Sequence, residues 1–416
     1  MSNFRPFKAV RPLPSYAKLV AALPYDVMTS DEAREKVQGN PYSFLHVDKA
    51  EIDLPLGTDI YSDEVYETAA RNLHSLKNDE IMKQDTYPCY YIYEQEWQGR
   101  SQTGLVGCAS IDEYLDGRIK KHELTRADKE ADRIRHVDTC DANTGPIFLT
   151  YKGDDEIDKI IDIYKKTNMP IYDFESEGEV HNKVWVVNND KGVVDMLQKA
   201  FQNVEALYIA DGHHRCASAV KVGEKRRADN PSFTGDEEFN FFLAVAFPKD
   251  ELRILDYNRV MKNTKGYSKE DFFKAINEKF TIETTLNLDP YAPEERHSFG
   301  MFFQGKWYRL IAKEGTYDEN DPVASLDVSI LQDNLISPIL GIDDPRTDKN
   351  IDFVGGIRGL GELEERCKDD MDIAFSMFPT SLDELIRIAD AGKLMPPKST
   401  WFEPKLLSGL FIHLLK

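Results

Sequence analysis

The sequence predicts a mixed α/β protein built around a mixed sheet. Apolar runs of strand length, of which 239–247 is the clearest, alternate with segments of helical character. Residues 298–310 alternate around a Gly-Lys pair, as a hairpin does. Ser268 precedes two acidic residues and a helical pattern, which marks a helix start. Hydrophobic residues make up 41% of the 416, enough for a sizeable core.

Each element follows from a local pattern, taken in chain order. Residues 1–50 are dense in proline and aromatics and predict irregular, packed chain, with one helix capped by Ser30 or Thr29. Apolar or alternating runs bounded by turn residues predict strands at 87–95, 104–114, 146–151, 184–188, 204–210, 239–247, 253–257, 298–310 (a hairpin), 351–354 and 373–377. Capped or amphipathic stretches predict helices at 59–83, 123–138, 155–167, 216–227, 268–279, 327–340, 362–369 and 381–391.

Domain boundaries are weakly marked, because the chain has no internal repeat, low-complexity tract or long polar linker. Its length suggests two or three domains. Changes in pattern place boundaries near 150 and 265. We therefore expect an N-terminal α/β region (1–150), a central segment (151–265) and a C-terminal α/β region (266–416).

The charge balance disfavours whole classes of partner. The 52 Lys and Arg residues against 73 Asp and Glu leave a formal net charge of −21. So acidic a surface repels phosphate backbones and anionic lipid, which argues against nucleic-acid and membrane-surface binding. A local basic pocket for one small anion is compatible with this charge.

Targeting and cysteine patterns predict a cytoplasmic protein. The N-terminus has no apolar signal-peptide region, and no run approaches the roughly 20 apolar residues that cross a bilayer. The five cysteines are scattered and contain no Cys-x-x-Cys pair. This pattern fits a reducing compartment and disfavours both a disulfide framework and a cysteine zinc site.

The segment 207–219 carries the clearest chemistry. An apolar strand runs into Asp-Gly-His-His-Arg and then into a helix. A helix N-terminus offers unpaired N–H groups and partial positive charge, and Gly212 lets the backbone approach a ligand closely. Arg215 can grip a phosphate through two N–H groups, and His213 and His214 add donors. The sequence therefore predicts a phosphate or nucleotide site here.

Asp211 has two candidate roles beside this turn. It could hold a magnesium ion, or it could orient or deprotonate a substrate hydroxyl. The alternative for the whole motif is an ordinary capped helix with polar histidines at its surface. Three potentially cationic side chains oppose the helix dipole at that end, so fold stability alone would favour acids there.

The same residues carry a family resemblance. The turn resembles the phosphate-binding signature of the ParB/sulfiredoxin fold, and the chain resembles an uncharacterised bacterial family, a domain of unknown function, that shares this fold and is similar to ADP-dependent free-serine kinases. The matching segments are 5–7, 24–27, 40–47, 122–125, 208–215 and 395–405. The resemblance implies a ParB/sulfiredoxin-like nucleotide-binding core with N- and C-terminal elaborations.

One departure from the wider fold family is informative. Sulfiredoxin-like proteins use Gly-Cys-His-Arg with a nucleophilic cysteine, whereas this chain has His213 at the cysteine position. Sulfinic-acid repair is therefore not expected. Cys216 lies one residue beyond Arg215, where a helix start could lower its pKa, but a buried, inert cysteine is the favoured interpretation.

A second charged segment could contribute to the same site. His122, Thr125, Lys129 and Arg133 are candidate phosphate or nucleotide ligands, and Glu123 is a candidate general base. Lys129 and Arg133 are four residues apart, so they share one helical face. The alternative is a solvated helix, because acidic residues interleave with these cations.

Two loops complete the candidate site. Tyr25 and Asp26 are expected to bind substrate, although Asp26 could equally cap the following helix. Lys398, Ser399 and Thr400 follow a rigid Pro-Pro pair and present a cation and two hydroxyls. Such a loop could close over phosphate, or it could be an ordinary turn.

The leading functional hypothesis is a phosphotransferase that moves phosphate between a nucleotide and a small hydroxylated metabolite, most simply free serine or phosphoserine. The expected cofactors are ADP or ATP with Mg²⁺, and Asp211 or Glu123 would accept the hydroxyl proton. The alternatives are a regulatory protein that binds a nucleotide or phosphometabolite without turnover, and a structural protein with a vestigial pocket.

Overall fold

The structure is a computed structural model that describes residues 2–188, 192–263, 265–285 and 289–416. Contacts divide the chain into two compact units. The first comprises Met1–Leu252 with Pro404–Lys416, and the second comprises Arg253–Glu403. The mixed α/β class predicted from the sequence is confirmed.

The first unit is built on a nine-stranded mixed sheet within the described residues, in the order β6-β11-β8-β12-β5-β4-β10-β9 with β1 beside β5. The pairs β8–β12 and β6–β11 are parallel, and the remaining pairs are antiparallel. The strands of this sheet are β1 (Phe4–Arg5), β4 (Tyr90–Trp97), β5 (Arg100–Ser110), β6 (Ile119–Lys120), β8 (Ile147–Tyr151), β9 (Tyr172–Ser176), β10 (Val180–Val187), β11 (Leu207–Asp211) and β12 (Phe241–Pro248). Four short strands form separate pairs: β2 (Val10–Pro12) with β3 (Met82–Gln84), and β7 (Ala142–Asn143) with β21 (His413–Leu414).

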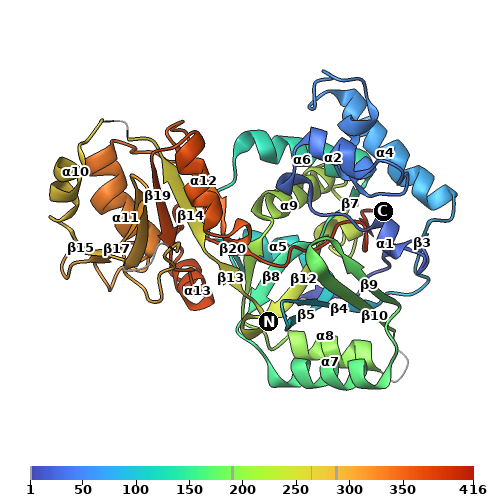
Figure 1. Ribbon diagram of the computed structural model, residues 1–416. Helices are drawn as coiled ribbons and strands as arrows, with labels where there is room; N and C mark the ends of the chain where they lie inside the picture. The colour runs from blue at the N-terminus through green and yellow to red at the C-terminus, as the bar shows by residue number, and fades with distance from the viewer. Residues whose placement is uncertain (1, 189–191, 264, 286–288) are drawn as a thin grey trace. The chain divides into compact units, whose positions relative to one another are not determined.

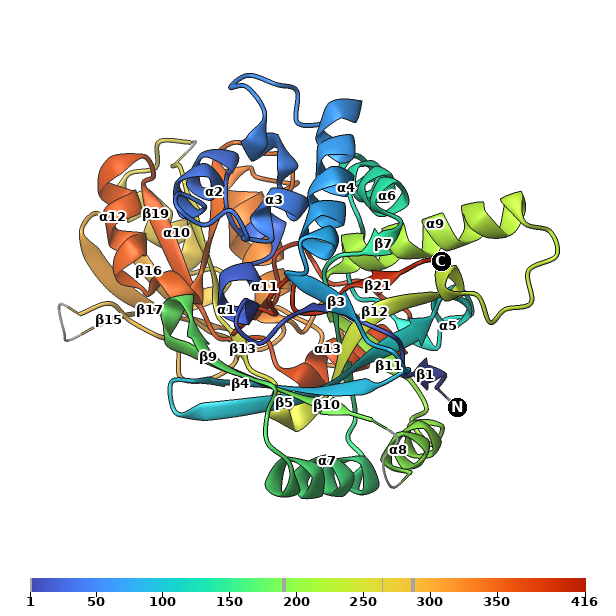
Figure 2. The same cartoon turned by 90° about the vertical axis from the view of Figure 1, so that its right-hand side faces the viewer.

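Helices cover the sheet of the first unit. They are α1 (Ala17–Val20), α2 (Ser30–Lys36), α3 (Leu45–Asp48), α4 (Asp63–Asn78), α5 (Ile111–Leu115), α6 (Ala127–Cys140), α7 (Asp155–Thr167), α8 (Val193–Phe201) and α9 (His213–Asp229). In both ribbon views α7 and α8 lie on one side of β4, β5 and β10, and α4 and α6 lie on the other (Figures 1 and 2). Helix α2 begins at Ser30, and the side chain of the preceding Thr29 caps it by accepting the Glu32 N–H.

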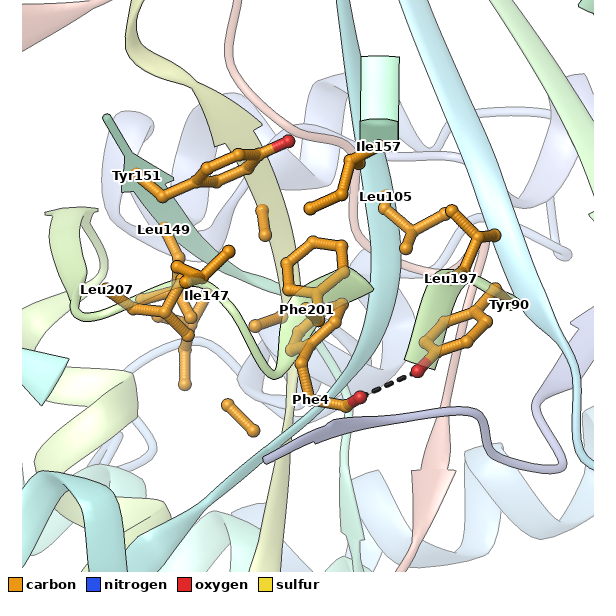
Figure 3. Close-up of a cluster of buried hydrophobic side chains, with 14 of the residues drawn as sticks. Phe4, Tyr90, Leu105, Ile147, Leu149, Tyr151, Ile157, Leu197, Phe201 and Leu207 are labelled. Atoms are coloured by element: carbon orange, nitrogen blue, oxygen red, sulfur yellow. Dashed lines mark hydrogen bonds between the residues drawn. The ribbon is translucent and has the colours of Figure 1, made fainter. Parts of the chain in front are cut away.

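The core beneath α7 and α8 is dominated by aromatic and branched side chains (Figure 3). Phe201 of α8 stacks on Phe4 with ring centroids 4.9 Å apart and meets Tyr151 edge-on. The Tyr90 hydroxyl donates a 2.6 Å hydrogen bond to the Phe4 carbonyl, which satisfies its one polar atom inside the core. This core makes β8, β11 and β12 a rigid platform for the turns at their ends.

The last residues of the chain complete the first unit. Ile412 bridges Val10, Ser408 bridges Ala22, and β21 pairs with β7. Phe411 and Ile412 have no exposed surface. The segment 404–416 is therefore part of the core.

The second unit contains a six-stranded antiparallel sheet within its described residues, in the order β15-β17-β16-β19-β14-β18. The strands of this sheet are β14 (Tyr257–Met261), β15 (Phe280–Thr284), β16 (Ser298–Phe303), β17 (Lys306–Ala312), β18 (Ile351–Gly355) and β19 (Ile373–Met377). Two short strands, β13 (Ile254–Leu255) and β20 (Trp401–Phe402), form a separate antiparallel pair. Its helices are α10 (Lys269–Ile276), α11 (Asp327–Leu331), α12 (Gly361–Asp369) and α13 (Leu382–Asp390). The predicted hairpin at 298–310 is confirmed as β16 and β17.

The region predicted as one regular helix, 327–340, changes character midway. After α11 the chain continues as a π-helix, Gln332–Leu340, with Pro338 inside it. Proline has no N–H and its ring clashes with the carbonyl four residues earlier, so a wider turn accommodates it. Among the described helices of either unit, none is long and apolar enough to cross a membrane.

The three regions expected from the sequence remain a prediction. The two units into which contacts divide the chain have other boundaries. Strands on both sides of residue 150 share the nine-stranded sheet, because β5 and β12 pair directly. The chain leaves the first unit after Leu252 and returns to it at Pro404.

Candidate functional site

The strand-to-helix turn lies in the first unit. Strand β11 ends at Asp211, Gly212 takes a left-handed conformation (φ 90°), and α9 begins at His213. A side chain at position 212 would be strained at this φ, and its Cβ would lie 3.2 Å from the Arg215 guanidinium. The predicted turn is confirmed, and α9 starts three residues earlier than the expected 216.

The Asp211 carboxylate is held by two donors. Its Oδ1 accepts the Gly212 N–H at 2.7 Å, and its Oδ2 lies 3.0 Å from Lys405 Nζ. Burial alone would raise the pKa of Asp211, but the charges of Lys405 and Arg215 outweigh it and hold that pKa well below its usual range. Asp211 is therefore an ionised group that fixes the turn.

Arg215 reaches from α9 toward the loop before β8. Its guanidinium donates to the Pro146 carbonyl at 2.6 Å, while its Nε is buried without a hydrogen-bond partner. Together with Tyr25 and Arg133 it lines a cavity of about 20 Å³, space for little more than one water molecule. The structure thus brings together three residues that the sequence named separately.

Arg133 is fixed from two sides. It pairs with Asp132 at 2.9 Å, and its guanidinium lies over the Tyr25 ring, 4.1 Å from the centroid. The pKa of Arg133 is raised despite the opposing effect of burial, chiefly because Asp132 is adjacent. The cavity is therefore lined by two permanent cations, of which Arg133 has its own carboxylate partner.

His122, Glu123 and His213 form a second cluster next to the turn. The two imidazole rings meet edge-to-face with centroids 4.5 Å apart, and His213 Nδ1 lies 4.0 Å from Glu123 Oε2. Both histidines are buried, at 2% and 6% exposure. Burial lowers the pKa of His122 to about 4, and burial with the neighbouring His122 lowers the pKa of His213 well below its usual range. Both rings are neutral at pH 7.

Other predicted site residues make local contacts. The Thr125 hydroxyl donates to Glu130 at 2.6 Å, and Lys129 Nζ lies 3.4 Å from the Tyr61 hydroxyl. His214 Nε2 accepts the Arg126 N–H, and burial lowers the pKa of His214. Asp26 is exposed. Roles for these residues in ligand binding remain predictions.

The loop with Lys398, Ser399 and Thr400 belongs to the second unit. Ser399 is buried, and its hydroxyl donates to the Pro396 carbonyl at 2.7 Å. The Lys398 ammonium lies over the Tyr257 ring at 5.6 Å. These contacts hold the loop within its own unit, and its part in a phosphate site remains a prediction.

Sequence reasoning missed Lys405 as a site residue. It lies at the end of the family-like segment 395–405, which was the available signal, but its pairing with Asp211 spans 194 residues. His136 was also missed, although it lies three residues after Arg133 on α6 and lines the same cavity. Asp48 and Thr144, hydrogen-bonded to each other at 2.9 Å in the cavity wall, have no local sequence signal.

The fold and this turn define a mixed α/β protein in which a glycine-initiated helix follows a sheet strand directly. The chain belongs to a family described as protein of unknown function (DUF1015), whose model matches residues 4–329. The family resemblance found in the sequence is thereby confirmed. No curated protein matches the chain.

Several solved structures are similar in fold. A free serine kinase in complex with AMP is 12% identical, with a TM-score of 0.37 over 71% of this chain and 86% of that one. A conserved hypothetical protein from Pyrococcus furiosus is 13% identical (TM-score 0.36, 74% and 94% covered). C-terminally truncated SbnI from Staphylococcus aureus is 10% identical (TM-score 0.37, 73% and 85% covered). Likenesses of this size do not bear on the activity of this chain.

Proposed function

We propose that the protein is a nucleotide-dependent phosphotransferase that acts on a small hydroxylated metabolite. The observation that carries the proposal is the placement of Arg133 and of Arg215, from the first turn of α9, around one cavity. Guanidinium groups are donors that phosphate prefers, because each can make two parallel hydrogen bonds.

Local charge supports an anion at this place. Lys405 and Arg215 both act on the carboxylate of Asp211 and lower its pKa. The first turn of α9 contains no acidic residue to complement its dipole. A bound phosphate would complement the dipole at this end of α9, although the chain as a whole carries −21.

The two candidate bases differ in their exposure to solvent. Both oxygens of Asp211 already accept hydrogen bonds, and its low pKa makes it a weak proton acceptor. The Glu123 side chain is 40% exposed and adjacent to His213. We therefore assign the proton-accepting role to Glu123, and to Asp211 the role of positioning the Gly212 turn.

Magnesium would neutralise phosphate charge during transfer. The Asp211 carboxylate does not fit this ion as it stands, because the Lys405 ammonium occupies one oxygen and would repel a second cation. No step of the proposal is assigned to a metal at Asp211.

Phosphate entry requires movement of side chains, because the cavity is only about 20 Å³. Tyr25 sits in a single short turn, Tyr25–Val27, at the cavity wall, and Arg215 is tied to the main chain by one hydrogen bond to Pro146. These two side chains are the ones whose displacement would open the cavity to a phosphate group.

The second candidate is a regulatory protein that binds a nucleotide or phosphometabolite without turnover. The engagement of Asp211 by Lys405 favours it, since that carboxylate is then unavailable for chemistry. A binder needs the cations of the cavity but does not need Glu123.

A transfer assay separates the two. The purified chain is incubated with ADP or ATP and free serine, and with phosphoserine for the reverse direction, alongside Glu123→Gln and Arg215→Ala. A phosphotransferase predicts turnover in the wild type, nucleotide binding without turnover in Glu123→Gln, and lost binding in Arg215→Ala. Nucleotide binding with no turnover on any acceptor would support the regulatory protein, and unimpaired binding by Arg215→Ala would contradict both candidates.

A further inference from the structure

His122, Glu123 and His213 bring three metal-ligating side chains to one place. One ligand atom from each lies within 4.8 Å of the other two. His122 and Glu123 come from the segment before α6, and His213 is the first residue of α9. Among the described residues of both units, this is the one group of three or more His, Cys, Asp or Glu that meets this distance.

Three of the four imidazole nitrogens in this cluster lack hydrogen-bond partners. Both ring nitrogens of His122 and the Nε2 of His213 are buried and have none. The backbone of Ile209 acts on the pKa of His122 without reaching hydrogen-bond geometry, and the edge-to-face ring contact satisfies none of these nitrogens. Buried polar atoms nearly always have a hydrogen-bond partner, and each buried polar atom without one lowers the stability of the fold by about 1–3 kcal/mol. A group from outside the polypeptide is therefore expected at this place.

The types of side chain in this cluster suit a metal ion of the zinc class. Two imidazole nitrogens with one carboxylate match the ligand set of catalytic zinc sites, in which a further position stays open. Mg²⁺ and Ca²⁺ prefer oxygen ligands, so this set disfavours them.

We propose that His122, Glu123 and His213 bind a divalent transition metal of the zinc class, with an open position for water or a substrate oxygen. The proposal does not depend on phosphotransferase activity. Ligand atoms around tetrahedral zinc are about 3.4 Å apart, so the three side chains would close in from their present separations of up to 4.8 Å. Residues 121–126 are in neither helix nor strand, which allows His122 and Glu123 to make this adjustment.

Metal binding would change the role of Glu123. A carboxylate that ligates zinc cannot at the same time serve as an unencumbered base, so the proton-accepting role would pass to a metal-bound water or to another group. The competing occupant is a phosphate oxygen bonded to the neutral imidazoles, as the sequence predicted for His122 and His213. The two occupants are distinguished by what the protein binds in isolation.

The test uses the full chain after treatment with a chelator. Zn²⁺ is titrated by calorimetry, Co²⁺ by its visible absorption, and Mg²⁺ and inorganic phosphate by calorimetry as comparisons. We expect one equivalent of Zn²⁺ or Co²⁺, a Co²⁺ spectrum without thiolate charge transfer, and no comparable binding of Mg²⁺. Absence of a stoichiometric site, or phosphate binding without metal binding, would overturn the proposal.

Variants locate the site. His122→Ala and His213→Ala should abolish stoichiometric binding. Glu123→Gln should weaken it by more than the roughly 10–100-fold that loss of an outer-shell partner causes. His74→Ala, on the exposed face of α4, is the matched control and should bind as the wild type does. If a buried histidine variant fails to fold, Glu123→Gln decides, because that side chain is 40% exposed. Unchanged affinity in folded Glu123→Gln would remove Glu123 from the site and contradict the assignment.

Discussion

Lys405 and Asp211 are 194 residues apart in the chain, and their side chains meet at 3.0 Å. The pair joins the last segment of the first unit to the end of β11. It keeps the Asp211 carboxylate ionised while that carboxylate accepts the Gly212 N–H. The geometry of the turn therefore depends on a residue outside the motif that forms it.

Replacing Lys405 by Met should destabilise the first unit by about 1–3 kcal/mol at pH 7, because a largely buried carboxylate loses its main counter-charge. A lowered pKa stabilises the fold above the unfolded-state value, so the difference from wild type should shrink as the pH falls below about 4. Urea unfolding at several pH values measures it.

The control is Lys416→Met, which breaks another lysine–aspartate pair, to Asp141, in which the lysine side chain is 80% exposed. Its effect should stay within about 0.5 kcal/mol. Equal losses of stability in the two variants would show that the Lys405–Asp211 pair stabilises the fold no more than an exposed ion pair does.

Arg215→Ala should weaken nucleotide binding about 10- to 150-fold, because a charge-assisted contact contributes about 1.5–3 kcal/mol. Its stability should fall by only about 0.5–1.5 kcal/mol, the worth of the hydrogen bond to Pro146. Arg215→Lys should recover part of the affinity, since it keeps the charge but loses the planar fork. Calorimetry with ADP and ATP, beside melting temperatures, measures both effects.

Arg126→Ala serves as the control for Arg215. Arg126 is exposed and pairs with Asp128 two residues away. Its loss should leave nucleotide affinity within a factor of about two to three. A large drop in melting temperature in Arg215→Ala with unchanged affinity would make Arg215 a structural residue.

Asp327, in the second unit, should make stability depend on pH. Burial raises the pKa of Asp327 to about 7, against a weaker lowering by the His297 N–H that it accepts at 2.9 Å. The unfolded carboxyl ionises near pH 4, so between about pH 4 and 7 the folded state holds the extra proton and stability falls as the pH rises. Asp327→Asn should flatten this part of the profile.

The measurement for Asp327 is denaturant unfolding of the second unit's transition from pH 4 to 8. Asp333→Asn, six residues later, changes an exposed carboxyl and should leave the slope of the profile nearly unchanged. A wild-type profile that is already flat between pH 4 and 7 would show that Asp327 is ionised in the folded protein.

Phe201→Ala should destabilise the first unit by about 3–5 kcal/mol, because its ring has no exposed surface and contacts both Phe4 and Tyr151. Met196→Ala on the same helix, where the side chain is 49% exposed, should change stability by less than about 1 kcal/mol. Chemical denaturation compares them, and similar losses would contradict the assignment of this core to α8.

Local patterns predicted much of the fold and less of the site. The strand at 239–247 could be predicted because its residues form a continuous apolar run. The helix at 155–167 could be predicted because a capping aspartate directly precedes it. Helix α8 was missed although Val194, Leu197 and Phe201 have helical spacing, because it follows a glycine and not a capping side chain. Strand β9 was missed because its residues are largely polar.

The site likewise has a part that local sequence predicts and a part that it does not. The turn from Asp211 through Gly212 to α9 follows from neighbouring residues, so its conformation could be predicted. Its pairing with Lys405, and the meeting of Tyr25, Arg133 and Arg215 around one cavity, depend on packing between distant segments. No spacing in the chain encodes such meetings.

The return of residues 404–416 to the first unit has a consequence for biosynthesis. The ribosome makes Met1–Leu252, then all of Arg253–Glu403, and only then the segment that places Phe411 and Ile412 in the first core. The second unit is thus fully synthesised while the first still has an open apolar seam at Val10 and Ala22. The nascent first unit must therefore wait for residues 404–416, and until they are made the apolar surface that they cover in the folded unit stays exposed.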